Sequence, residues 1–227
     1  MDDGTWNQTR PFLLKTSNST EVRILKESIP FIAVPMIVAA VSSILGLWSL
    51  LALSLFVALF MAFFFRDPKR EPPVDANVIV APADGKVTSV RILDESVQDS
   101  PVVISIFLSP LDVHINRAPI PGRITDVVYS PGKFLMATDK NASLVNEQNI
   151  LTIQNDKITV VCKQIAGILA RRVVCWKKKG DNLDLGERFG LIKFSSRTDV
   201  ILPSHVSITV SQGQRVRGGI TVIGRIS

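Results

Sequence analysis

The sequence has no Asp, Glu, Lys, Arg or His anywhere from Ser28 to Phe65, a run of 38 residues. Such a run is too long for a buried core helix, and a single run is too short to supply the many membrane spans of a transporter. It also excludes a disordered chain, which combines low hydrophobicity with high charge. Residues 71–227 carry 19 basic and 15 acidic side chains, which is the balance of an ordinary globular domain. We therefore expect one membrane-attached segment followed by one such domain.

Cysteine and histidine are scarce, with two of each in 227 residues. Cys162 and Cys175 form no C-x-x-C pair, and few histidines are near them, which argues against a zinc site. We expect both thiols to stay reduced in a cytoplasmic domain, and we expect no bound metal. The sequence contains no motif for nucleic acid, so no nucleic-acid partner is expected.

The uncharged run predicts a helical hairpin. As a single helix it would be about 57 Å long, against a hydrocarbon core of about 30 Å. Ser and Gly residues cluster near its middle, and basic residues flank both ends, which favours two helices that return to the cytoplasmic side. We predict the hairpin within residues 29–65 and a cell-membrane anchor over residues 1–70. A single tilted span with one end outside is the alternative.

Residues 71–227 predict a mainly β domain, either a sandwich or a barrel, on the cytoplasmic side. A stiff boundary with three prolines in residues 66–73 precedes it. Short runs rich in Val and Ile follow, most of them bounded by Pro, Gly, Asp or Asn, as is typical of strands. These runs are residues 78–80, 87–92, 102–107, 124–129, 150–153, 158–165, 171–176, 191–194, 200–202, 206–210 and 220–226. Residues 165–171 fit either a helix or a strand-turn-strand.

Polar residues that could carry chemistry lie beside these predicted strands. His114 lies in a segment where Asp, His, Asn and Arg occur within six residues, next to the end of a predicted strand. Asp84 lies in a Pro-x-Asp-Gly turn, which turn geometry alone explains. Ser195 and Ser196 lie between two predicted strands, and their position alone assigns them no role. From the residues alone, catalysis by His114 is no better supported than a structural role.

Four segments in this order resemble the short-chain phosphatidylserine decarboxylases, including the archaetidylserine decarboxylases of archaea. They are residues 82–85 (PADG), 107–117 (FLSPLDVHINR), 164–167 with 170–172 (QIAG, ARR) and 188–197 (RFGLIKFSSR). The resemblance covers about residues 66–227, and the N-terminal hairpin also fits the short branch of the family. It implies a pyruvoyl-dependent decarboxylase that converts a serine phospholipid, with ester or ether tails, into the ethanolamine phospholipid.

The resemblance also implies a self-cleaving proenzyme, cut between residues 195 and 196. The Ser196 hydroxyl would attack the carbonyl of Ser195, and Ser196 would then become the pyruvoyl cofactor. His114, oriented by a carboxylate such as Asp84, would act as the base and later as the acid that protonates the product. The pyruvoyl ketone would form a Schiff base with the substrate amine and withdraw electrons as carbon dioxide leaves.

Two positions depart from the family pattern. The family has Gly before the cleaved serine, where this chain has Ser195, and a left-handed conformation costs a serine roughly 1–2 kcal/mol. We therefore hypothesise that cleavage is slowed or blocked, by natural variation or by an engineered change. Longer relatives have a second histidine where Arg117 stands, so that histidine's role does not transfer. Arg117 and Lys193 are candidates to bind the lipid phosphate, and a structural role fits both equally well.

The expected partners are the phospholipid, the membrane and the chain's own two fragments, residues 1–195 and 196–227; assembly with further copies is left open. Two rival functions remain. One is an inactive family member that serves as a membrane-bound, lipid-binding scaffold. The other is a biotinyl- or lipoyl-type binding module, which needs a modified lysine in an exposed hairpin, and Lys86 is not placed like one.

Overall fold

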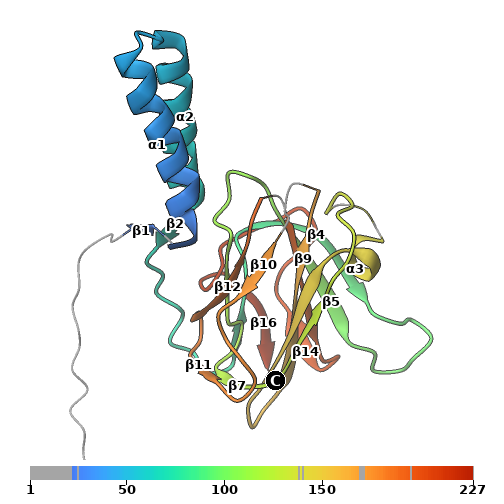
Figure 1. The fold of residues 1–227 in the computed structure, drawn as a ribbon. Helices are drawn as coiled ribbons and strands as arrows, with labels where there is room; N and C mark the ends of the chain where they lie inside the picture. Colours follow the sequence, from blue (N-terminus) through green and yellow to red (C-terminus); the bar gives the residue numbers. More distant parts are fainter. Residues whose placement is uncertain are drawn as a thin grey trace, which may run out of the picture.

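The computed structural model describes residues 22–24, 26–137, 139, 141–168, 172–194 and 196–226. Two long helices pack side by side and project from a β domain (Figure 1). The prediction of a mainly β fold preceded by a helical hairpin is therefore confirmed.

The hairpin consists of α1 (Ile29–Ile44), preceded by the 3-10 helix η1 (Lys26–Ser28), and α2 (Trp48–Phe64). Pro30 lies in the first turn of α1, where a missing N–H costs no hydrogen bond. Gly46 makes the turn between the helices with a φ of +69°, a conformation that glycine adopts without strain. The segment Lys26–Ile44 is long and apolar enough to cross a membrane, and α2, with 17 residues, is about 25 Å long.

The strands of the described β domain form one large sheet and two small ones. The large sheet has the order β11-β7-β8-β9-β13-β5-β4-β15 and curls into a half-barrel. The small sheets have the orders β10-β12-β6 and β14-β16-β3, and β1 pairs with β2 at the base of the hairpin (Figure 1). The bounds are β1 Val22–Ile24, β2 Arg66–Pro68, β3 Val78–Val80, β4 Gly85–Ile92, β5 Val102–Leu108, β6 Ile115–Arg117, β7 Gly122–Ser130, β8 Gln148–Gln154, β9 Thr159–Ala166, β10 Val173–Cys175, β11 Asn182–Leu183, β12 Arg188–Ile192, β13 Ser196–Leu202, β14 Val206–Ile208, β15 Arg215–Val216 and β16 Val222–Ile226.

The aliphatic runs of the sequence correspond to strands whose apolar side chains form a common core. Ile79, Ile104, Leu151 and Phe189, from four different strands, are all fully buried in it. The core also contains Cys162, whereas Cys175 is only partly buried; both are free thiols. Burial of apolar side chains on this scale is the main stabilising contribution to such a fold.

The structure differs from the sequence prediction at several short elements. The sequence pattern predicts no strand at Ile115–Arg117, yet these residues form β6 and are all buried. It also missed β11, β15 and the short helix α3 (Ala142–Val145). At residues 165–171, β9 continues through Ala166 and no helix includes residues 167–168, while residues 169–171 lie outside the described part. These missed elements are polar or only two to four residues long, so they carry little hydrophobic periodicity.

Asp67 in β2 ties the base of the hairpin to the β domain. Its carboxylate is 1% exposed and accepts from Arg117 of β6 at 3.1 Å and from Arg188 of β12 at 2.9 Å. Arg117 also donates to the carbonyls of Gly186 and Pro68. Three segments that are far apart in sequence are therefore joined around one buried carboxylate.

Replacing Asp67 with Asn is expected to destabilise the protein by about 3–5 kcal/mol, because it leaves the buried Arg117 guanidinium without its counter-charge. Asp75→Asn is the matched control, since the Asp75–Arg225 pair is solvent-exposed and such pairs contribute about 1 kcal/mol or less. Urea unfolding in detergent, followed by tryptophan fluorescence, measures both. Equal shifts for the two variants would show that the Asp67 cluster is not a structural anchor.

Candidate active site

His114 lies directly before β6, and its backbone is fixed because its carbonyl accepts the N–H of Ile192 at 3.1 Å. Its side chain is buried, and Nδ1 lies 2.9 Å from the carbonyl oxygen of Asp112. A carbonyl oxygen can only accept, so Nδ1 carries the hydrogen and Nε2 holds the free lone pair of the neutral ring. Nε2 is buried and has no hydrogen-bond partner within the described residues. This imidazole is therefore oriented as a base with its accepting nitrogen unused.

Burial lowers the pKa of His114 from 6.5 to about 4, against the opposing effect of the Asp112 carbonyl. The ring of Phe64, from the end of α2, packs against it with centroids 4.3 Å apart. An apolar surrounding disfavours the charged imidazolium. The ring is therefore neutral at physiological pH and ready to accept a proton.

Ser196 is the first residue of β13 and is completely buried. Its backbone is fixed on both sides, since Ser196 pairs with Leu108 of β5 and with Ala166 of β9. Its hydroxyl oxygen also lacks a hydrogen-bond partner within the described part of the chain. Buried hydroxyls are usually hydrogen-bonded, so an unpartnered one in a rigid strand suggests a functional role.

The strand geometry places His114 and Ser196 at the same end of the site. Asn116 donates to the Thr198 hydroxyl at 2.9 Å, which joins β6 of the small sheet to β13 of the large one. Ile192 of β12 donates its N–H to the His114 carbonyl and packs in one cluster with Ala166 of β9, and Ala166 pairs with Ser196 of β13. Two residues before the Asn116–Thr198 contact in each segment lie His114, which directly precedes β6, and Ser196, the first residue of β13.

A chain of buried amides supports this arrangement. Asn149 donates to Gln164 at 3.0 Å, Gln164 donates to Asn116 at 2.9 Å, and Asn116 donates to Thr198. All four side chains are buried. Gly190 lies over this chain, where a Cβ would be 2.8 Å from the Gln164 amide nitrogen. The sequence pattern does not predict this network. Its only signal in the sequence is the presence of polar residues inside otherwise aliphatic strands.

Asp84 lies in the turn between β3 and β4, as its Pro-x-Asp-Gly motif predicts. Its carboxylate accepts from Arg70 and from the backbone N–H of Gly218, each at 2.7 Å. Burial raises the pKa of Asp84, and the Arg70 charge opposes this effect. No hydrogen bond joins Asp84 to His114 among the residues that the structure describes, and the orienting contact of His114 is the Asp112 carbonyl.

The two candidates for phosphate binding are placed differently. Arg117 is buried, and its guanidinium is occupied by Asp67 and by backbone carbonyls. Lys193 is partly exposed, and its ammonium lies 5.1 Å from the ring centroid of Phe31 in α1. Partial burial lowers the pKa of Lys193. Lys193 therefore lies at the base of the hairpin.

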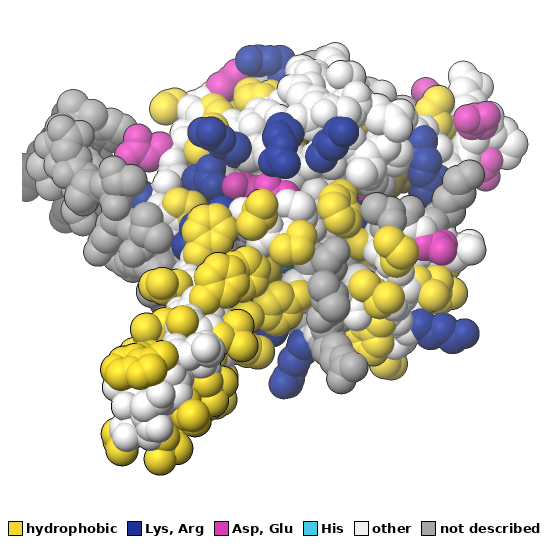
Figure 2. Space-filling view, turned by 90° about the horizontal axis from the view of Figure 1, so that it is seen from above, with side chains coloured by type: hydrophobic (Ala, Val, Ile, Leu, Met, Phe, Trp, Pro, Cys, Tyr) yellow, Lys and Arg dark blue, Asp and Glu magenta, His cyan; other side chains and the backbone are white. Residues whose placement is uncertain are grey.

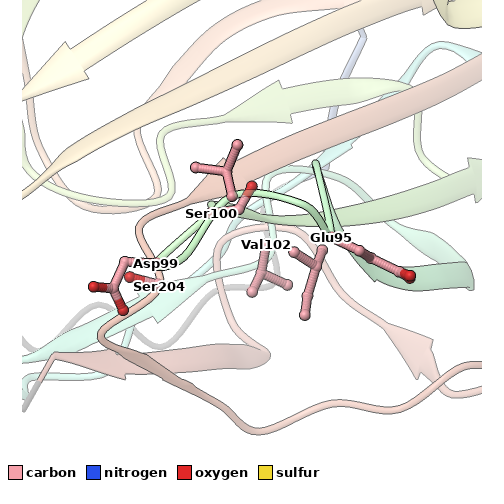
Figure 3. Close-up of a pocket in the computed structure, with 7 residues that line it drawn as sticks. Glu95, Asp99, Ser100, Val102 and Ser204 are labelled. Carbon is pink, nitrogen blue, oxygen red and sulfur yellow. The ribbon is translucent and has the colours of Figure 1, made fainter.

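Ser195, the predicted cleavage partner of Ser196, lies outside the described residues. A separate pocket of about 480 Å³ lies at the loop between β4 and β5 (Figure 3). Its two acidic side chains, Glu95 and Asp99, point away from each other, and none of the predicted site residues lines it. This pocket is therefore not part of the candidate site.

A buried serine, together with a buried, neutral histidine that packs against the end of an apolar hairpin, supplies the two groups that an enzyme with a self-activated serine needs. The phosphatidylserine decarboxylase family model matches residues 57–224, and the chain belongs to this family. Proteins named phosphatidylserine decarboxylase proenzyme match it from Prosthecochloris aestuarii (47% identity; 78% of this chain and 82% of the relative) and Geotalea uraniireducens (44%; 88% and 95%). A third, from Symbiobacterium thermophilum, is 45% identical over 89% of this chain and 95% of its own length.

Family membership confirms the function predicted from the sequence, a pyruvoyl-dependent carboxy-lyase for a serine phospholipid made as a self-cleaving proenzyme. It excludes the biotinyl- or lipoyl-type module. The family's pyruvoyl group derives from a serine, and Ser196 fits this origin because its buried hydroxyl has no described partner that would compete for it.

Proposed function

We propose that this chain cuts itself between Ser195 and Ser196 and then decarboxylates phosphatidylserine at the site that the cut creates. The observation that carries the proposal concerns Ser196 Oγ and His114 Nε2, two buried atoms without a hydrogen-bond partner among the described residues, which lie at the start of β13 and directly before β6. A nucleophile and its base need this kind of placement.

In the first step, Nε2 of His114 accepts the hydroxyl proton of Ser196, and Oγ attacks the carbonyl carbon of Ser195. The peptide C–N bond breaks, the nitrogen regains a proton, and an ester joins residue 195 to the Ser196 side chain. Removal of the Ser196 α-proton then breaks the ester C–O bond and frees the carboxylate of residue 195. Addition of water to the remaining unsaturated end releases ammonia and leaves the ketone.

The pyruvoyl group supplies a carbonyl that withdraws electrons from the substrate carbon as carbon dioxide leaves. The chain's own residues provide the surroundings. The Phe64 ring shields His114 from water, and the buried ring returns a proton readily because burial disfavours its charged form. His114 is thus suited to protonate the product carbon. Asp84 acts through the Arg70 and Gly218 contacts that hold the neighbouring turn.

Lys193 is the better placed of the two phosphate candidates, because Arg117 is already paired with Asp67. A lysine ammonium beside the base of the hairpin can attract a lipid phosphate from the membrane surface. The aromatic rings around it offer apolar surface to the adjoining part of the lipid. This assignment lets the substrate keep its tails in the membrane during the reaction.

The hairpin supports attachment to the cell membrane. Its surface is almost continuously hydrophobic, and Lys and Arg side chains lie on the face of the β domain around its base (Figure 2). Lys26, Arg66 and Lys69 lie at the base, and basic residues there favour the cytoplasmic side. We infer that both helix ends and the β domain lie in the cytoplasm, against the leaflet that holds the substrate.

The decisive test is the intact mass of the protein purified in detergent, together with carbon dioxide release from phosphatidylserine vesicles. We expect two fragments, with the small one starting at residue 196 and lighter by one ammonia than an unmodified peptide. Borohydride in the presence of the lipid should attach substrate to the small fragment only. An uncut chain that releases no carbon dioxide would instead support the inactive scaffold.

Replacing Ser195 with Gly is expected to accelerate self-cleavage by roughly 5- to 30-fold, because glycine removes a left-handed strain of about 1–2 kcal/mol during attack. The fraction of cut chain over time after cell-free synthesis measures the rate. Ser204→Gly, the same replacement in an exposed turn, is the matched control and should leave the rate unchanged. An unchanged rate in Ser195→Gly would show that Ser195 does not limit cleavage.

A further inference from the structure

Phe194 has an unusual backbone conformation next to the predicted cut. Its φ is +58°, and the only other described non-glycine residue with a positive φ is Asp99. Asp tolerates this region through local hydrogen bonds, whereas a bulky aromatic residue rarely occupies it. Asp99 lies in an exposed loop, but Phe194 is two residues before the buried Ser196. The surrounding structure must therefore hold Phe194 in this conformation.

Aromatic rings from the hairpin surround Phe194. Its ring stacks on Phe64 of α2, with centroids 4.5 Å apart and planes 23° apart. Phe65 and Phe31 meet it edge-on at 6.3 Å and 6.0 Å. Phe64 and Phe65 are almost completely buried, so these contacts belong to a packed cluster. The same Phe64 ring lies against His114.

We propose that Phe194 is a positioning residue for self-cleavage, held in its left-handed conformation by the Phe64 ring. This conformation sets the direction in which the chain enters the segment that contains the cleaved bond. Self-cleavage then requires the hairpin to be docked on the β domain, and the anchor takes part in maturation as well as in attachment. The inference depends on the proposed cut before Ser196.

The first test compares two replacements of Phe194 in the full chain, synthesised in the presence of liposomes. Phe194→Ala removes the ring and still penalises a positive φ, so cleavage should slow by about 5- to 30-fold. Phe194→Gly also removes the ring but adopts a positive φ freely, so it should regain most of that loss. A purely packing role predicts the opposite order, because glycine fills the cluster even less. Phe194→Gly cutting no faster than Phe194→Ala overturns the proposal.

The second test separates the hairpin's contribution. Phe64→Ala should slow cleavage of the natural chain by at least a similar factor, but should slow Phe194→Gly by a clearly smaller factor, because only the Phe64 contact with His114 is then lost. Phe56→Ala is the matched control, since Phe56 is on the same helix and exposed. Equal rates for Phe64→Ala and Phe56→Ala, or full additivity with Phe194→Gly, contradict the coupling.

Ser196→Ala in the same assay tests the proposed cleavage site separately from the positioning role of Phe194. If Ser196→Ala still cuts, the proposed cleavage site is wrong and the inference fails with it. If Ser196→Ala stays uncut while Phe194→Gly is cut no faster than Phe194→Ala, the cleavage site stands and only the positioning role of Phe194 is wrong. Cleavage itself is the readout, so the result does not depend on decarboxylase activity.

Discussion

Ser196→Ala is expected to yield a single uncut chain without decarboxylase activity. Without the hydroxyl no ester can form, and without the ester the pyruvoyl group has no source. The loss should therefore be complete in both assays, rather than a reduction in rate. The fold should be kept, because the Ser196 hydroxyl has no described hydrogen-bond partner that its removal would leave unsatisfied.

Gel analysis of the purified protein and carbon dioxide release from phosphatidylserine vesicles measure this result. Ser207→Ala is the matched control, since it removes an exposed hydroxyl from the same C-terminal fragment and should be cut normally. Thermal unfolding of Ser196→Ala should match that of uncut natural chain. Two fragments from Ser196→Ala would place the cut at another residue.

The hairpin and most strands could be predicted because their patterns are local. The uncharged run and the short aliphatic runs each report burial from the residues themselves. β6 could not be found in this way, because Asn116 and Arg117 are buried through partners far away in sequence. Asn116 bonds a residue 82 positions away, and Arg117 bonds one 50 positions away. Burial that depends on such pairing leaves no periodic signal in the chain.

The candidate site was predictable only in part. The family resemblance indicated His114 and Ser196, and these residues precede and begin two strands that the Asn116–Thr198 hydrogen bond joins. The same resemblance suggested that Asp84 orients His114, whereas its described contacts are Arg70 and Gly218. Its turn motif, which has a purely structural explanation, accounts for these contacts. The orienting group of His114 is a backbone carbonyl, which no side-chain motif can reveal.

The packing of Phe64 into the site could not be predicted from the sequence. The sequence pattern separates an anchor over residues 1–70 from a domain over residues 71–227. The last residues of α2 instead pack into the site, against both His114 and Phe194. Burial, to which this apolar helix end contributes, lowers the pKa of the His114 imidazole. The anchor and the site are therefore physically one unit at this position.

His114→Gln is expected to slow self-cleavage by about 10²- to 10⁴-fold, the usual contribution of a positioned base. Glutamine keeps a polar side chain of similar reach but cannot accept the proton. Because burial places the pKa of His114 at about 4, the natural chain should cut at a constant rate from neutral pH to about 5 and lose activity as the pH approaches 4. His205→Gln, in an exposed turn, is the matched control and should keep the natural rate.

The same pKa predicts a stability effect with a defined sign. The folded pKa of His114 lies below its ordinary value of 6.5, so the unfolded chain binds a proton more readily between these two values. The natural chain should therefore lose stability as the pH falls from about 6.5 to 4, by on the order of 3 kcal/mol. His114→Gln should lack this part of the acid sensitivity. If its unfolding midpoint falls with pH as steeply as that of the natural chain, His114 is not the buried neutral base that the structure describes.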